Sequence, residues 1–454
     1  MSIPDGPRQP KVVQLAQWVW RPMPFMEECF RRYGEMFHVR LAGFSDGVFV
    51  CTPELNKEIY MAPPDVLHAG KANELLRPAL GNHSLLLLDE AEHLRERRLL
   101  LPPFHGERMQ SYATLMRDLT EAAVDSWPLG QPMAVHSKMQ AITLDVILRA
   151  VFGAEEGAQG DALKQRIVAL MNFNQPFLAF APDWMKADFF GSPYRAFLKL
   201  RAAADAVIYE LIRERRKAGG EGREDILSLL LSAKDEAGHP LTDEELRDEL
   251  MTMLLAGHET SATAASFVIE RLMVERAAHE KLEAELDTVL GGGRLEPQHL
   301  PKLEYLDATI KETLRLRPIV PVVARTVMKD GFTLGGRPIP KGWMVFPCIY
   351  LTQRHPRLFP EPEAFRPERF IGTKPDPYAW MPFGGGMRRC IGMAFALYEI
   401  KIILATVLSR VRLRAVRPGG EHVVRRGVIL APGRGAQTLI TERRVPGTAL
   451  RPTG

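Results

Sequence analysis

Apolar residues recur at three- and four-residue spacing between about residues 105 and 315, which predicts a chain built mostly of helices. Residues 139–151 and 196–216 show this pattern clearly. The longest predicted helix begins at a capping box, residues 242–245, and continues without proline into the 270s. At about 1.5 Å per residue, thirty residues would span about 45 Å, enough to cross a whole domain.

Strand-like patterns are fewer and shorter. Residues 37–41 and 48–51 alternate around a glycine-containing turn and predict a hairpin. Short strands are also expected after Pro318, at residues 322–327, 332–334 and 344–346. A last helix should follow Cys390 and end near Arg410. The pattern therefore predicts a mainly α fold with a small β part, in one large domain over residues 1–454.

Charge and cysteine content narrow the class of protein. The 59 basic and 55 acidic residues leave a net charge of only +4, which argues against a nucleic-acid partner. The four cysteines are far apart and form no CxxC pair. This spacing argues against a disulfide framework or a zinc site and fits a reducing compartment.

The N-terminal region is the part of the sequence where a membrane-spanning helix could be suspected. Residues 12–30 are partly apolar, but Arg21, Pro22, Pro24, Glu27 and Glu28 interrupt them, so no stretch reaches the roughly 20 apolar residues of a spanning helix. The order of segments also lacks the features of a signal peptide. We expect a surface helix here, no membrane anchor and a cytoplasmic protein.

The strongest chemical signal is the segment 383–392, FGGGMRRCIG. Its three glycines allow the backbone to turn tightly and to approach a flat ligand closely. Cys390 precedes an apolar helix, whose free N–H groups would stabilise a thiolate. The alternative interpretation is a structural cysteine buried beside a glycine turn.

This segment resembles the signature of the cytochrome P-450 superfamily, Phe-x-x-Gly-x-Arg-x-Cys-x-Gly, at every fixed position. The resemblance extends over about residues 20–440. It implies heme b, buried between the long central helix and the last helix, with Cys390 as the axial thiolate to the haem iron. Such a thiolate donates electron density that favours O–O cleavage. It also places Phe383 against the cofactor and Arg388 at a propionate.

Two further motifs follow the family's order. Glu312 and Arg315 stand three apart on one helical face, a weak signal alone. In the family this pair is buried and joined by an arginine of a later Pro-Glu-Arg-Phe, here Arg369 in residues 367–370. The resemblance therefore implies a structural triad that holds the cysteine loop.

The second motif, AGHET at residues 256–260, lies midway along the long helix. Gly257 costs a helix interior roughly 1 kcal/mol relative to alanine, so a compensating reason is expected. One reason is close approach of oxygen and water, with Glu259 and Thr260 supplying an acid and an alcohol for proton delivery. The other is a helix-packing glycine beside a capping-type threonine. The cysteine motif favours the first, and no catalytic role is assigned to His258.

By the same resemblance, His93 and Arg97, four apart on one helical face, and Arg325 contact the haem propionates. A buried dianionic cofactor needs such partners, because unpaired buried charge is costly. Arg95 and Arg98 are interpreted as exposed arginines.

The implied reaction is insertion of one atom of O2 into a lipophilic substrate, similar to bacterial members that act on fatty acids and terpenoids. No reductase domain fits after residue 410, so electrons from NAD(P)H should arrive through a separate ferredoxin or flavodoxin and its reductase. Docking is expected at Arg388 and Arg389 with Arg95 or Arg98, on a protein acting as a monomer.

The resemblance also implies an apolar substrate pocket and a lid at residues 172–190. The pocket residues would be Leu85, Met253, Ala256, Val320, Val322, Val428 and Ile429. Two alternatives stay open. A peroxide-driven peroxygenase or isomerase is disfavoured by the intact Glu259–Thr260 pair, and a non-catalytic haem sensor by the lack of a recognisable output domain.

Overall fold

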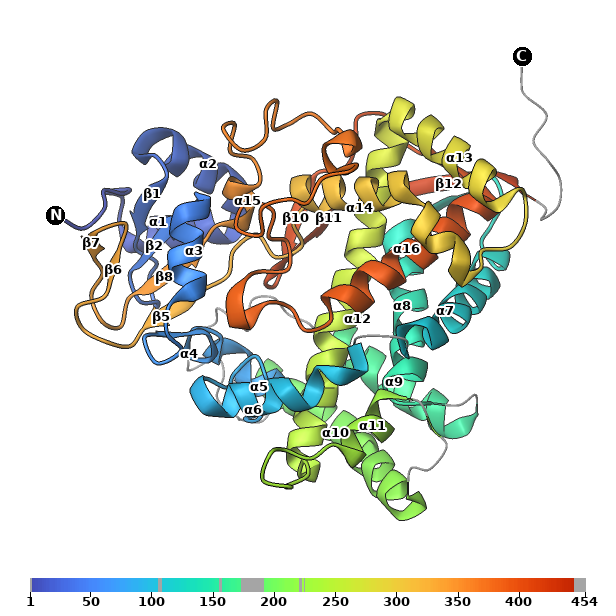
Figure 1. The fold of residues 1–454 in the computed structure, drawn as a ribbon, viewed down its shortest axis with the longest axis horizontal. Helices are drawn as coiled ribbons and strands as arrows, with labels where there is room; N and C mark the ends of the chain where they lie inside the picture. Colours follow the sequence, from blue (N-terminus) through green and yellow to red (C-terminus); the bar gives the residue numbers. More distant parts are fainter. Residues whose placement is uncertain are drawn as a thin grey trace.

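The computed structural model describes residues 2–104, 108–154, 157–172, 192–219, 223 and 225–444, and the predicted lid lies almost wholly outside them. Helices predominate (Figure 1). They are α1 Lys11–Trp20, α2 Pro22–Tyr33, α3 Pro53–Met61, α4 Ala69–Ala72, α5 Arg77–Leu80, α6 Glu90–Leu100, α7 Arg108–Asp125, α8 Val135–Ala150, α9 Ala158–Asn172, α10 Pro193–Ala218, α11 Ile226–Ser232, α12 Asp243–Val274, α13 Arg276–Leu290, α14 Glu304–Leu316, α15 Ile349–Thr352 and α16 Met393–Arg410.

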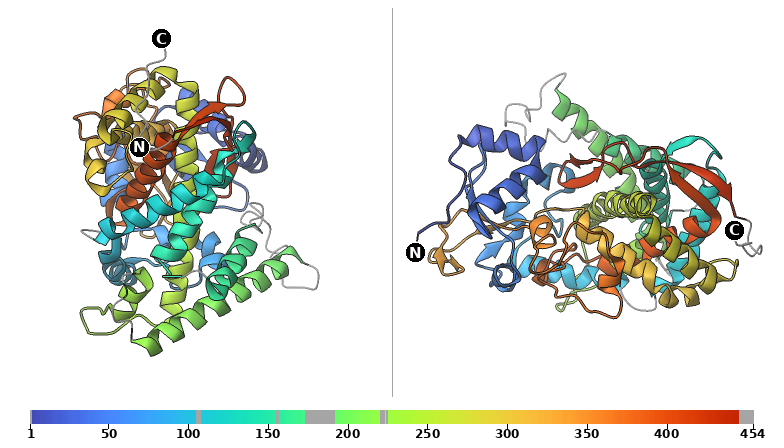
Figure 2. Two further views of the ribbon diagram at one scale, coloured as in Figure 1. Left: turned by 90° about the vertical axis from the view of Figure 1, so that its right-hand side faces the viewer. Right: turned by 90° about the horizontal axis from the view of Figure 1, so that it is seen from above.

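The long helix α12 organises the main core. Its capping box forms as predicted: the Glu245 N–H donates to Thr242 Oγ1 (3.1 Å), and the Thr242 N–H donates to a Glu245 carboxylate oxygen (2.7 Å). α12 crosses the centre of the molecule and is seen nearly end-on in the right-hand view of Figure 2. It packs against α8, α14 and α16, and most buried apolar residues form one continuous cluster around these helices. This core is the rigid frame on which the site is built.

The strands of the described residues form four small sheets. Its strands are β1 Met36–Val39, β2 Gly47–Val50, β3 Leu67–His68, β4 Pro132–Ala134, β5 Arg325–Val327, β6 Thr333–Leu334, β7 Arg337–Pro338, β8 Met344–Pro347, β9 Val411–Ala415, β10 Val423–Arg426, β11 Ile429–Pro432 and β12 Gln437–Arg443. The largest sheet has the order β1-β2-β8-β5-β3 and lies beside the N-terminal helices (Figure 1). β1 and β2 form the predicted hairpin, with Phe37 opposite Phe49.

Several predicted boundaries were wrong. The expected surface helix at 12–30 is two helices, because Pro22 begins α2 at a position where no intrahelical N–H is needed. The strand expected at 322–327 is shorter, and only Arg325–Val327 joins the sheet. The C-terminal strands β9 to β12 were not predicted. Among the described residues, no helix is both long and apolar enough to cross a membrane.

Candidate functional site

Cys390 ends a tight loop just before α16. Its N–H donates to the Phe383 carbonyl (3.0 Å), and the Arg389 N–H donates to the Gly386 carbonyl (3.1 Å). Among the four cysteines Cys390 alone is exposed, whereas the other three are buried. The loop thus closes on Phe383 and leaves the Cys390 thiol available to a ligand.

The surroundings of this thiol are those of an internal space. Burial raises the pKa of Cys390, and the Gly392 N–H and the charges of Arg97 and Arg389 oppose that rise. The thiol is therefore accessible at its surface and yet closely surrounded by protein atoms. The N–H and the two guanidinium groups would stabilise a thiolate there.

The predicted tight turn is present at Gly384 and Gly386, where φ is positive, and two of the three loop glycines also pack closely against Tyr60. A Cβ on Gly386, where φ is 62°, would lie 2.2 Å from the Tyr60 carbonyl oxygen. A Cβ on Gly385 would lie 2.6 Å from the Tyr60 ring. Gly384 has φ 68° and nothing near its missing Cβ. Close packing against α3 therefore accounts for Gly385 and Gly386, and a left-handed turn accounts for Gly384.

Four cationic or donor side chains gather next to the Cys390 loop. Burial and the neighbouring charges of Arg388, Arg97 and Arg325 together lower the pKa of His93 to about 3, so its imidazole is neutral. Burial lowers the pKa of Arg325, and it lowers the pKa of Arg388 to about 10. Arg388 reaches Asp89 and the carbonyls of Leu85 (3.1 Å) and Leu88.

This cluster carries uncompensated positive charge. Asp89 is the acid that opposes it, while the guanidinium of Arg325 donates to its neighbour's carbonyl, that of Ala324 (2.7 Å). Arg97 is half-buried and has no acidic partner among the described residues. Buried positive groups that depress one another's pKa are satisfied by an anion between them. A dianionic, thiolate-ligated macrocycle such as haem fits this set of groups.

A stripe of four residues in the middle of α12 is at least partly accessible. Met253, Gly257 and Thr260 are half-buried and Ala256 is exposed, at the i, i+3, i+4 and i+7 spacing of a single face. The Thr260 hydroxyl donates to the Ala256 carbonyl (2.5 Å). A Cβ on Gly257 would lie 2.9 Å from Ile147 of α8, which supports the packing interpretation of this glycine.

The carboxylate of Glu259, the residue before Thr260, points towards α8. Gln140 Nε2 donates to Glu259 Oε2 (2.6 Å), and His136 Nε2 lies 3.4 Å from Glu259 Oε1; both partners are on α8. Burial raises the pKa of Glu259, but the hydrogen bonds from His136 and Gln140 and the charges of His136 and His258 lower it below its ordinary value. The acid is therefore ionised and makes no hydrogen bond with Thr260 in this arrangement.

The predicted pocket residues fall into two groups. Leu85 and Ile429 are buried in the main core, against which Met253 and Val320 pack. Val322 packs on the N-terminal cluster instead, and Val428 is exposed in the turn between β10 and β11. The Leu430 N–H donates to the Ile319 carbonyl (2.8 Å), which joins β11 to the segment that carries Val320.

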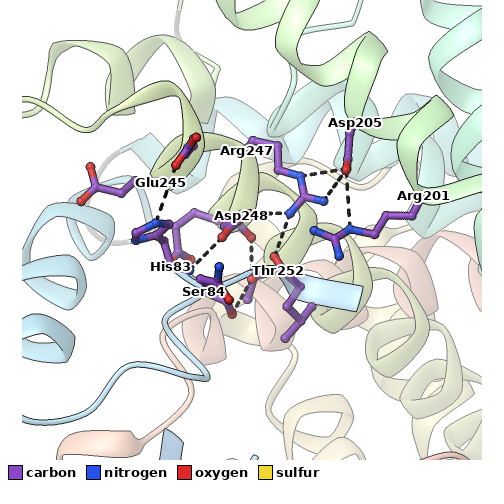
Figure 3. A network of polar contacts seen from close by, with 12 residues as sticks. His83, Ser84, Arg201, Asp205, Glu245, Arg247, Asp248 and Thr252 are labelled. Carbon is purple, nitrogen blue, oxygen red and sulfur yellow. Dashed lines mark hydrogen bonds and ion pairs between the residues drawn. The ribbon is translucent and has the colours of Figure 1, made fainter. Parts of the chain in front are cut away.

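A polar network fixes the wall that contains Leu85. Arg247, buried on α12, pairs with Asp205 of α10 (2.6 Å) and with Asp248, and Asp248 accepts from the His83 N–H (2.8 Å) (Figure 3). Next along the chain, the Leu85 N–H donates to Glu249 (2.6 Å). These bonds tie α10 and residues 83–85 to one end of α12.

The predicted structural triad is present. Glu312 and Arg315 are fully buried and form two hydrogen bonds (2.7 and 2.9 Å), while Arg369 Nε lies 3.5 Å from Glu312 Oε1. Arg315 also donates to the carbonyls of Gln353 (2.9 Å) and Pro362 (2.7 Å). The pair therefore joins α14 to the long segment that leads to the Cys390 loop.

The predicted basic docking patch was partly wrong. Arg95 binds Asp235 (2.7 Å) and Glu245 (2.9 Å), so it is not a free surface charge. Arg388 turns inward, as described above. Arg98 is exposed but pairs with Glu236, and Arg389 is exposed.

Sequence reasoning missed His136 and Gln140. They are four residues apart and therefore lie on one helical face, and this spacing could have marked them as candidate site residues. Nothing in the sequence indicates that this face meets Glu259, because the two segments are more than a hundred residues apart.

Comparison with known proteins places this fold and site in a family. The family model for cytochrome P450 matches residues 4–435. The chain is 37% identical over 446 residues to putative cytochrome P450 135B1 of Mycobacterium tuberculosis (98% of this chain, 92% of that one). It is 35% identical over 416 residues to putative cytochrome P450 137 of the same species (91% and 84%).

Solved structures of cytochromes P450 have the same fold as this chain. The cytochrome P450DA heme domain superposes with a TM-score of 0.85 at 27% identity, covering 98% of each chain. The retinoic acid-bound cyanobacterial CYP120A1 gives a TM-score of 0.84 at 24% identity over 98% of this chain and 100% of that one, a likeness of fold. The protein belongs to the cytochrome P450 family. It is accordingly a haem-dependent monooxygenase that uses O2 and a redox partner.

Proposed function

We propose that the Cys390 thiolate would hold the iron of heme b, and that the enzyme inserts one oxygen atom into a lipophilic substrate between the Cys390 loop and α12. The observation that carries this proposal is the exposed thiol of Cys390 beside Arg97, Arg325 and Arg388, whose positive charge Asp89 neutralises only in part. When bound, thiolate-ligated haem supplies the activation and cleavage of O2.

The cationic side chains would hold the haem propionates. Arg97, Arg325 and Arg388 supply charge-assisted N–H donors, and neutral His93 supplies a ring N–H. Phe383, half-buried within the Cys390 loop, would shield the thiolate from water. Because Arg97 and Arg389 oppose the rise in the pKa of Cys390, the same groups favour its ligating form.

Thr260 and Glu259 would have different roles in proton delivery. The Thr260 hydroxyl lies on the accessible stripe of α12, where it can orient a water molecule beside the reacting oxygen. Glu259 would accept protons from solvent and release them towards Thr260. Since its carboxylate is directed to α8, it must leave Gln140 to do so.

The substrate pocket would be apolar, with Met253, Ala256 and Val320 next to the haem and Val322 and Val428 towards its entrance. Such a lining selects by shape and hydrophobic burial, which suits a fatty acid or a terpenoid. Electrons from NAD(P)H would come through a separate ferredoxin or flavodoxin and its reductase. Arg389 and the exposed Met387 beside it would contribute to the docking surface.

Thr260→Ala tests this function most sharply. The variant should bind haem and substrate normally, because neither uses the hydroxyl. NADPH oxidation should continue while product per NADPH falls and hydrogen peroxide rises, by about 10- to 100-fold if general-acid assistance has its usual size. Ser266→Ala is the matched control, because Ser266 is fully buried on the same helix and its hydroxyl also donates to the carbonyl four residues earlier. Unchanged coupling in both Thr260→Ala and Glu259→Gln would contradict the assignment and would show that protons arrive by another route.

A further inference from the structure

The carboxylate of Glu259 is bound by two side chains of α8. Gln140 is fixed at both ends, because its carbonyl meets His258 Nε2 (2.9 Å) and its side-chain amide donates to Glu259 Oε2 (2.6 Å). His136, which is 3% exposed, places Nε2 3.4 Å from Glu259 Oε1 and 3.1 Å from Thr263 Oγ1. Both oxygens of the acid therefore face α8, while Thr260 lies on the accessible stripe of α12 and donates to the Ala256 carbonyl.

We infer that His136 and Gln140 are positioning residues that hold the Glu259 carboxylate ionised and turned towards α8, so that they limit when it can deliver a proton. The inference rests on the proposed role of Glu259. The side chains of His136 and Gln140 contact Glu259 and Thr263 of α12, and the Gln140 carbonyl contacts His258. We therefore expect both residues to act through the acid.

The charges around Glu259 determine the direction of the effect. His136 on α8 and His258 on α12 are the titratable groups that face it, and Glu399 of α16 interacts with Ser261 instead. Burial alone would raise the pKa of Glu259, and the His136 and Gln140 hydrogen bonds reverse that effect. Removing either bond should therefore raise the pKa of Glu259.

A higher pKa at Glu259 should shift the pH dependence of coupling in one direction. Glu259 donates a proton only in its protonated form, so product per NADPH should fall as pH rises through its pKa. A variant with a higher pKa at Glu259 should keep its coupling to a higher pH. Loss of an opposite charge or a hydrogen bond of this kind typically shifts a carboxyl pKa by about 1 unit or more.

The experiment compares His136→Gln and Gln140→Leu with the wild-type holoenzyme. Glu259 is followed by carbon NMR of the side-chain carboxyl in the reduced carbonyl complex, and Glu259→Gln assigns the signal. Coupling is then measured against pH with electron carriers in excess. Thr143→Val is the matched control, because Thr143 is buried on α8 and donates to the His258 carbonyl (3.2 Å) without contacting Glu259.

Both variants should raise the carboxyl pKa and move the midpoint of the coupling profile up by about the same amount, about 1 unit. Thr143→Val should move neither. In a Glu259→Gln background, His136→Gln should change coupling no further. An unchanged carboxyl pKa in both variants would overturn the inference, and so would a shifted pKa with an unchanged coupling profile. Failure of the proposed role of Glu259 would be seen separately, as wild-type coupling in Glu259→Gln itself.

Discussion

The buried pair of Glu312 and Arg315 gives the clearest energetic prediction. Glu312→Ala leaves the Arg315 guanidinium, which is 0% exposed, with carbonyl partners and no counter-charge. Breaking one side of such a pair costs about 3–5 kcal/mol. With an unfolding entropy of about 2.1 cal/mol/K per residue, the 454 residues give about 1 kcal/mol/K, so the apparent Tm should fall by about 3–5 °C.

Calorimetry of the haem-loaded protein measures this change, with haem content recorded in parallel. The control is Glu368→Ala, which removes a pair with Lys281 whose side chains are 48% and 60% exposed and which should cost less than about 1 kcal/mol. The double variant Glu312→Leu with Arg315→Met should recover much of the loss, since it leaves no buried charge. Equal effects of Glu312→Ala and Glu368→Ala would refute the reasoning.

Two further predictions concern the Cys390 loop and the cationic cluster. Gly386→Ala should destabilise the protein by about 1–3 kcal/mol more than Gly384→Ala, because only the former brings a Cβ against the Tyr60 carbonyl; thermal melting of both variants compares them. Arg97→Leu should release haem to apomyoglobin about tenfold faster, the equivalent of one charge-assisted hydrogen bond of about 1.5 kcal/mol, whereas exposed Arg98→Leu should not. Equal release rates for these two arginine variants would contradict the propionate assignment.

Local signals in the sequence predicted the features that depend on neighbouring residues. The capping box and unbroken periodicity predicted α12, and the spacing of Glu312 and Arg315 placed them on one face. The order of residues around Cys390 predicted its loop. In each case a few consecutive positions contain the geometric information.

Features that depend on distant segments could not be predicted in this way. Arg95 was interpreted as a surface charge, but its partners Asp235 and Glu245 lie 140 and 150 residues further along the chain. The direction of Glu259 depends on which face of α8 packs against α12. Gly385 and Gly386 of the Cys390 loop pack against Tyr60, which lies on a helix more than three hundred residues earlier. These contacts come from tertiary packing, which no local pattern encodes.

The most direct test of the central assignment is the absorption spectrum of the reduced carbonyl complex in wild-type protein and in Cys390→Ser. We expect the wild type to show the strongly red-shifted Soret band of thiolate-ligated haem. The serine variant should lose that band even if it retains haem through the cationic cluster. Cys29→Ser, which changes a buried cysteine remote in sequence, is the control and should keep it. A Cys390→Ser protein that keeps the red-shifted band would show that another residue ligates the iron.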